Sequence, residues 1–329
     1  MASLGYAFLI NSPACLAWRR LAGDRAAQLA FTVAALIVLA CLAAPLYARM
    51  AGTDGYRSNV QGFLPDGVTE VLPQNTAGLG LGAMPIGPRW GVAYALGADG
   101  QGRDLAIRLL YGGRTSLLIA AAAAAFSLGL ALPIGVLAGF AGGGVDRALG
   151  WLLDLIWAFP VYLLAISLSA VLMSQDVRIG PVSLGSGSLA LPALILGVIF
   201  VPYVARPLRA EMRALGHADH VRAARALGAS PWHVLRRHIL PAAMRRLLLF
   251  APLILAFDLL TEAALSVLSI GVQPPAASWG TLIGDGQTLI YTRPVAAIAP
   301  GLAVVVTVLA LNLLSDRVQA VLDPKAHRR

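Results

Sequence analysis

The sequence predicts an all-α, polytopic membrane protein with about six transmembrane helices. Of its 329 residues, 58% are hydrophobic and only 12% are charged, and the mean hydropathy is +0.75. A water-soluble domain carries about 25% charged residues, so water cannot solvate most of this surface and lipid must cover it. The chain also contains several apolar runs, each long enough to cross the roughly 30 Å hydrocarbon core of a bilayer.

Six apolar runs are the expected spans. They cover residues 26–48, 115–140, 147–173, 188–206, 242–270 and 295–315. The first run follows the basic residues Arg19, Arg20 and Arg25, and no small-residue cleavage site follows it, so we expect a retained helix and not a cleaved signal peptide. The fourth run contains Pro192 and Pro202, which predict a kink or a frayed end.

These runs divide the chain between the two sides of the membrane. We expect an N-terminal segment at 1–25, a first helix at 26–48, an outer loop at 49–114, a core at 115–316 and a tail at 317–329. Most arginines, including those from Arg206 to Arg246, then share one side with the N-terminus. Because cytoplasmic loops are enriched in Lys and Arg, both termini are expected in the cytoplasm.

Other classes of protein fit the sequence less well. The net charge is +9, but the basic residues lie in short segments between apolar runs and form no continuous nucleic-acid-binding domain. The glycine-rich stretch Gly78–Gly82 lacks the strand-to-helix context of a dinucleotide site, so we expect a flexible loop. Cys15 and Cys41 are expected to be free thiols. The histidines lack metal-site spacing, so no metal is expected.

One cytoplasmic loop, at about 207–241, is long, basic and too polar to insert into the membrane. Within it, Asp219 is a good N-cap and Gly228 suits the left-handed position after a helix, which predicts a helix of about two turns between them. The small side chains of Ala223 and Ala224 would let another surface approach closely. A plainer interpretation is a surface helix that only reinforces the topology.

Three carboxylates fall inside the expected spans. Asp258 and Glu262 are four residues apart and therefore share one helix face. They are candidates for lining a translocation pathway, or for satisfying groups of neighbouring helices such as Ser or Thr hydroxyls and a broken helix end. A charge in the membrane should face protein or water. Asp154 lies near the cytoplasmic end of the third run and, with Pro160, is a candidate gate or structural residue.

The cytoplasmic loop resembles the "EAA" loop of ABC importer permeases. The residues that match its spacing are Ala223-Ala224, Gly228 and Leu240-Pro241, whereas Arg222 and His238 replace the family's Glu and Ile. In that family this loop forms the coupling helix that seats on an ATPase subunit. The resemblance therefore assigns ATPase coupling to Asp219, Arg222, Ala223, Ala224, Arg225, Gly228, Leu240 and Pro241.

Further segments resemble the C-type permeases of dipeptide, oligopeptide and nickel importers, in order along the chain from about 96 to 324. They are 96–104, 108–117, Ala158-Phe159-Pro160, 261–266, 271–275, 278–280 and 322–324. The resemblance implies a type I ABC importer permease fold in a bacterial inner membrane. It implies transport of di- or oligopeptides, with nickel or another small solute as an alternative.

The resemblance also implies partner subunits. These are a second homologous permease, two ATP-binding-cassette ATPases and an extracytoplasmic substrate-binding protein, with the lipid bilayer around the complex. The only lysine is Lys325, in a context unlike a phosphate-binding loop. We therefore expect no catalytic residue and no cofactor on this chain, with ATP and Mg²⁺ on the ATPases. A remaining alternative is an ion-coupled carrier that uses Asp258 and Glu262.

Overall fold

The computed structural model describes residues 23–60, 62–64, 67, 69–72, 84–173, 178–179, 182–183 and 187–322. The predictions for Cys15, for Arg19 and Arg20, for Gly78–Gly82 and for the tail beyond Leu322, including Lys325, lie outside these residues. The helices are α3 (Arg25–Leu42), α4 (Ala44–Ala51), α5 (Leu105–Ala141), α6 (Gly143–Trp157), α7 (Val161–Met173), α8 (Ala190–Gly216), α9 (Asp219–Ala226), α10 (Pro231–Val234), the π-helical turn η1 (Leu235–Ile239), α11 (Leu240–Val267), α12 (Trp279–Gln287) and α13 (Val295–Leu322).

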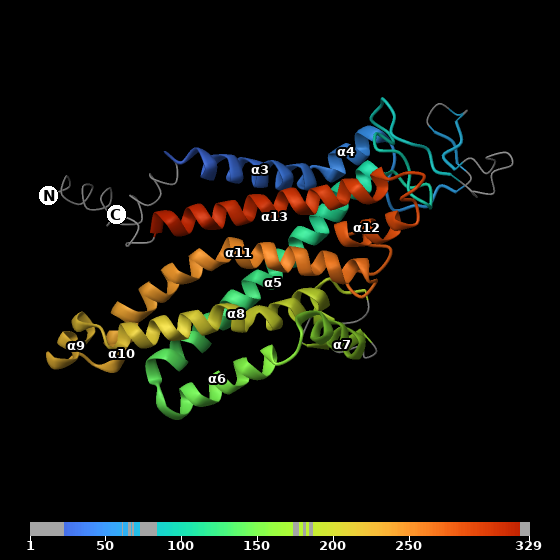
Figure 1. Ribbon diagram of the computed structural model, residues 1–329. Helices are drawn as coiled ribbons and strands as arrows, with labels where there is room; N and C mark the ends of the chain where they lie inside the picture. Colours follow the sequence, from blue (N-terminus) through green and yellow to red (C-terminus); the bar gives the residue numbers. More distant parts are fainter. Residues whose placement is uncertain are drawn as a thin grey trace.

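The described residues form an elongated helical bundle, which confirms the all-α prediction (Figure 1). The strands in it are β1 (Arg178–Ile179) and β2 (Val182–Ser183), which pair antiparallel with Arg178 opposite Ser183. Five helices are long and apolar enough to span a membrane, and a bent pair, α6 with α7, is a sixth candidate. The long α5 packs most extensively on α8 and also contacts α11, while α13 packs on α3, α11 and α12.

The third expected span, 147–173, is not one continuous helix. It is divided into α6 and α7, which are bent by 88° at the break between them. The break contains Pro160, which has no N–H to donate and disfavours helical backbone at the preceding Phe159. The first expected span is also interrupted, because α3 ends at Leu42 and α4 begins after Ala43 with a proline in its first turn.

Two helices extend beyond the apolar runs that predicted them. The helix α5 starts at Leu105, ahead of the expected 115, because Asp104 accepts hydrogen bonds from the N–H groups of Ala106 at 2.9 Å and Ile107 at 3.2 Å. The helix α8 continues to Gly216, so the first part of the expected 207–241 loop is helical. It stays helical because Leu208 and Met212 are fully buried, while arginines on its other side pair with α6.

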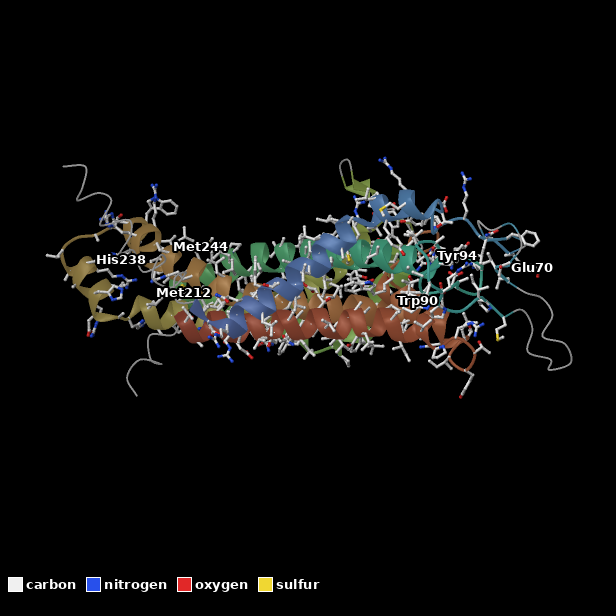
Figure 2. The ribbon with its side chains drawn as sticks, turned by 90° about the horizontal axis from the view of Figure 1, so that it is seen from above. Glu70, Trp90, Tyr94, Met212, His238 and Met244 are labelled. Atoms are coloured by element: carbon white, nitrogen blue, oxygen red, sulfur yellow. The ribbon has the colours of Figure 1, made fainter. Side chains whose placement is uncertain are left out.

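The two ends of the bundle carry different structures. Figure 2 shows Trp90, Tyr94 and Glu70 at one end and Met212, His238 and Met244 at the other. We call these the outer end and the coupling end. The start of α3 and the end of α13 lie side by side, since Arg317 Nη1 is 3.7 Å from Asp24 Oδ2, and both are at the coupling end in Figure 1.

The segment between α4 and α5 is packed at the outer end. Leu64, Val71, Tyr94 and Ala98 form a small buried cluster. The Tyr94 hydroxyl donates to the Gly102 carbonyl at 3.1 Å and accepts from the Asn59 amide at 3.2 Å. The described part of this segment is therefore a folded cap on the bundle.

Candidate functional site

The short helix α9 at the coupling end begins one residue earlier than its sequence suggested. Its N-cap is Ala218, and Asp219 is the first helical residue, so the prediction of Asp219 as the N-cap is wrong. The reason is local: the Asp219 carboxylate accepts a hydrogen bond from the Arg222 guanidinium one turn later. The prediction for Gly228 is confirmed, because it follows the helix with φ +86°.

The helix α9 is held against the bundle by one apolar side chain. Val221 is fully buried and packs in a cluster with Leu208 and Met212 of α8 and with Val234 and Ile239 downstream. On the flank, the Arg225 guanidinium lies 5.6 Å from the ring centroid of Phe140 on α5. So short a helix is marginal alone, and these contacts with α5 and α8 fix its position.

On the side of α9 and the following turn that faces away from Val221, apolar groups are exposed, and no described residue covers them. Leu227 is 89% exposed and Trp232 is 68% exposed, and Ala223 is exposed beside them. A Cβ atom added to Gly228 would meet no atom within 4 Å. We call Ala223, Leu227, Gly228 and Trp232 the coupling face.

A nearly continuous helical rod leads from the coupling face into the bundle. The Ser230 hydroxyl caps α10 by accepting from the His233 N–H at 3.2 Å, and α10, η1 and α11 together run for 37 residues from Pro231 to Val267. The turn in the middle is π-helical, since the Leu240 N–H donates to the Leu235 carbonyl. The wider turn accommodates Pro241, which has no N–H to donate. In a regular α-helix its ring would clash with the carbonyl four residues earlier.

The turn η1 also positions a histidine against α9. The ring centroids of His238 and His220 are 5.6 Å apart. His238 is where the sequence departs from the Ile of the "EAA" pattern, and its ring contacts the coupling helix. Leu240 and Pro241 are the first two residues of α11, directly after η1, and both are exposed.

Further along the rod, Glu262 is fully buried in a cluster of serines. The Ser266 hydroxyl donates to Glu262 Oε1 at 2.7 Å. Ser116 of α5 and Ser278 at the start of α12 also lie near this carboxylate, although neither closes a hydrogen bond of normal geometry to Oε2. The carboxylate therefore lies where α5, α11 and α12 meet.

The same serines accept hydrogen bonds from the backbone of the segment after α11. The Val272 N–H donates to Ser266 Oγ at 3.1 Å, the Trp279 N–H to Ser116 Oγ at 3.0 Å and the Thr281 N–H to Ser278 Oγ at 3.1 Å. Sequence reasoning anticipated Ser or Thr hydroxyls near the buried carboxylates but did not identify these three serines. Only Ser266, four residues after Glu262, could have been found from helix spacing.

Asp258, one turn before Glu262, has a different environment. It is fully buried, and within the described part of the chain neither of its carboxylate oxygens has a hydrogen-bond partner. A buried charge without a partner costs several kcal/mol. Both carboxylates are closed off from solvent in this conformation, and their contact with a solute stays a prediction.

Asp154 and Pro160 lie on the bent pair. The Asp154 carboxylate accepts from Arg206 Nη2 of α8 at 2.6 Å, and the same guanidinium lies 4.7 Å from the Trp157 ring centroid. Pro160 lies in the 88° break itself. This contact joins α6 to α8 next to the bend, as a structural or gate-supporting residue would. The described residues include no group of three or more His, Cys, Asp and Glu side chains that could hold a metal ion.

Comparison with known proteins adds to this geometry. Residues 131–328 match the family described as "Binding-protein-dependent transport system inner membrane component". A glutathione transport system permease protein, GsiD of Pectobacterium atrosepticum, is 34% identical over 71% of this chain and 73% of its own length. A peptide transport system permease protein of Brucella abortus is 33% identical over 96% of this chain and 93% of its own length.

The fold is also similar to a solved structure. A chain of the MetNI methionine ABC transporter, in an inward facing conformation, superimposes with a TM-score of 0.52 at 21% sequence identity. The match covers 66% of the present chain and 97% of that chain. At this level of identity the similarity concerns the fold alone.

Proposed function

Because the chain belongs to the binding-protein-dependent transport system inner membrane component family and is an ABC importer permease, we propose that it forms half of the translocation pathway of a peptide importer. We further propose that α9 and the coupling face connect it to a separate ATPase. The observation that carries this proposal is the exposed apolar Leu227 and Trp232 on a region whose other side is fixed by Val221.

The solute class is proposed from the relatives. Two of them are named for peptide and for glutathione transport, and glutathione is itself a small peptide. Nickel or another small solute remains the alternative within the family. An ion-coupled carrier that works alone would use Asp258 and Glu262, but the family match favours an ATP-driven importer.

The partners are proposed from the family, and the exposed residues of this chain suggest where each would bind. A second permease would pack against the bent pair, where Trp151 is 66% exposed and Tyr162 is 46% exposed. Two ATPases would bind ATP and Mg²⁺ and would contact the coupling face. ATP hydrolysis would therefore take place on those subunits and not on this chain. A substrate-binding protein would deliver the peptide to the outer end, and the coupling end with both chain termini would lie in the cytoplasm.

The mechanism uses the rod as a lever. At 1.5 Å per residue, the 37 residues from Pro231 to Val267 extend about 55 Å. Closure of the ATPase pair on ATP would move α9, and the packing of Val221 on Val234 and Ile239 would pass that motion to the rod. The far end of the rod holds Glu262 and the segment after α11. This is rigid-body alternating access biased by a partner.

The test compares two substitutions at Gly228. Asp and Asn both tolerate a left-handed backbone, and no neighbour obstructs either side chain, so both variants should fold and insert. Gly228→Asp adds a charge to an apolar docking surface and should abolish copurification of the ATPase and ATP-driven peptide uptake. Gly228→Asn is the uncharged control and should retain more ATPase copurification and more peptide uptake than Gly228→Asp. Normal uptake by Gly228→Asp would overturn the coupling proposal.

A further inference from the structure

A large cavity opens at the outer end of the bundle. Its volume is about 840 Å³, within the range of sites that hold small organic ligands. Its walls come from the packed segment before α5, from the first turn of α5, from the loop after α11 and from α12. Polar groups on these walls include Ser58, Gln101, Ser269, Gln273, Thr281 and Thr288.

Four charged side chains line one wall of this cavity. Asp99 is buried and accepts from Arg103 Nε at 2.7 Å. Asp285 of α12 is half-exposed, and its Oδ2 lies 3.4 Å from Arg103 Nη2 and 3.6 Å from Arg108 Nη2. The two positive and two negative charges balance, so the wall favours a ligand that carries separated charges of both signs.

The Arg108 guanidinium is poorly satisfied although its side chain is only 3% exposed. Its Nε lies 3.2 Å from Asp99 Oδ2 without forming a hydrogen bond, and its Nη1 donates to the Gly55 carbonyl over a long 3.3 Å. A buried guanidinium normally forms short, aligned bonds. Arg108 lines the cavity, and its Nη2 lies 3.6 Å from Oδ2 of the half-exposed Asp285, too far for a hydrogen bond.

We propose that this cavity is a holding site for short peptides with free termini. Arg103 and Arg108 bind the peptide's terminal carboxylate, and Asp285, displaced from its long ion pairs, binds the terminal ammonium group. Two guanidiniums side by side match the two oxygens of a carboxylate. This inference rests on the proposed function of peptide import and adds a site on the permease itself.

The cavity also contacts the rod. Ser266 lines its floor, and the Ser266 hydroxyl is the group that donates to Glu262. The segment that includes Val272 and Gln273 lines the cavity and is tied to the same serine. A peptide in the cavity therefore contacts the outer end of the rod, whose other end carries Trp232 of the coupling face.

The test measures equilibrium binding of trialanine to the complete permease–ATPase complex in nanodiscs, without the binding protein. Three forms of the peptide are compared: free, amidated at the C-terminus and acetylated at the N-terminus. Each modification removes one charge from the ligand and leaves the fold of the protein untouched. We expect each to weaken binding by about tenfold, as for the loss of a charge-assisted hydrogen bond.

The variant Asp285→Asn tests whether Asp285 binds the terminal ammonium group of the peptide. In Asp285→Asn, a half-exposed position, free and acetylated trialanine should bind equally, while amidation should still weaken binding about tenfold. Tyr291→Ala, at a fully exposed residue beyond α12, should bind all three peptides as the unmodified protein does. The inference is overturned if amidation has no effect, or if acetylation still weakens binding to Asp285→Asn.

Uptake measurements separate this inference from the proposed function. If the complex with its binding protein imports trialanine on ATP but the cavity binds no peptide, the holding site is wrong and the importer stands. If the complex imports no peptide at all, the proposed function itself fails.

Discussion

Ser266 Oγ lies 2.7 Å from Glu262 Oε1, one turn apart on α11, and accepts the Val272 N–H at 3.1 Å. The Ser266 hydroxyl thus joins the buried Glu262 carboxylate to the segment that follows α11. The arrangement is tight, because a Cβ atom added to Gly271 would lie 2.3 Å from the same oxygen. The carboxylate is therefore an organising centre for the loop between α11 and α12.

Replacing Glu262 tests this organising role. Glu262→Ala removes the acceptor of the Ser266 hydroxyl in a fully buried site, so we expect a loss of about 1–3 kcal/mol in the free energy of unfolding. Glu262→Gln keeps an amide oxygen that can accept from Ser266 and should lose less. Thermal unfolding of the two variants in detergent provides the measurement. Equal losses for Ala and Gln would show that the negative charge, and not the hydrogen bond, is what the site requires.

The sequence predicted part of this centre. Helical spacing placed Asp258 and Glu262 on one face, and both are buried on α11 as expected for carboxylates in a span. Ser116 and Ser278, which lie near Glu262, come from α5 and from the start of α12, and their approach depends on how three helices pack. Spacing along one segment cannot report a contact between distant segments, so it could not identify Ser116 and Ser278 as the hydroxyls near Glu262.

A second substitution pair separates anchoring from docking on α9. Val221→Ala removes two methyl groups from a fully buried site, so the free energy of unfolding should fall by about 2 kcal/mol. Leu227→Ala changes an 89% exposed side chain and should leave the stability of the chain unchanged while weakening ATPase copurification. Stability and copurification are measured on both variants. A stability loss at Leu227 equal to that at Val221 would contradict the assignment of the two faces.

The coupling region also shows where sequence reasoning succeeds and fails. Gly228 was identified correctly because a left-handed residue after a helix is a local requirement. Asp219 was misassigned because the choice between the N-cap and the first helical residue depends on competition with Arg222. The span 147–173 was treated as continuous because its hydropathy hardly changes at Pro160, whereas the 88° bend depends on backbone geometry.

The contact between Gly113 and Trp279 makes a prediction about packing in the outer half of the bundle. A Cβ atom at Gly113 would lie 2.5 Å from Cys41 Sγ and 2.6 Å from the Trp279 ring, and the ring is fixed by its Nε1–H, which donates to the Leu109 carbonyl at 2.9 Å. Gly113→Ala should therefore force α3 and α12 away from α5, at a cost of about 1–3 kcal/mol in the free energy of unfolding.

Gly129 provides the matched control for that substitution. It lies on the same helix, and a Cβ atom there would meet nothing within 4 Å. Gly129→Ala should be neutral or slightly stabilising, since alanine is favoured over glycine in a helix by about 1 kcal/mol. Thermal unfolding and the rate at which a thiol reagent reaches the buried Cys41 both report on the packing. Equal behaviour of the two variants would refute the close approach of α5 and α12.

Pro241 makes the last prediction, which concerns the π-helical turn. Without an N–H at Pro241, the Arg237 carbonyl cannot receive the normal helical hydrogen bond, and the Leu240 N–H donates instead to the carbonyl five residues earlier. Pro241→Ala restores a donor and favours rewinding of η1 into α-helix. When a π turn rewinds into α-helix, the chain before the turn rotates about the helix axis by about 100°, the angle that one residue contributes to a 3.6-residue turn. His238 would then leave its contact with His220, and α9 would face its partner in a different orientation.

The expected result is a stable but poorly coupled importer. Pro252 lies inside α11, outside the π-helical turn, so Pro252→Ala is the matched control. Both substitutions should raise thermal stability, because proline inside a helix costs about 3 kcal/mol relative to alanine. Only Pro241→Ala should lower the ratio of peptide imported to ATP hydrolysed in proteoliposomes, because only it changes the geometry between α9 and the rod. If η1 has rewound and that ratio is unchanged, coupling does not depend on the orientation of α9. The proposal that motion passes from α9 to the rod through this geometry would then be wrong.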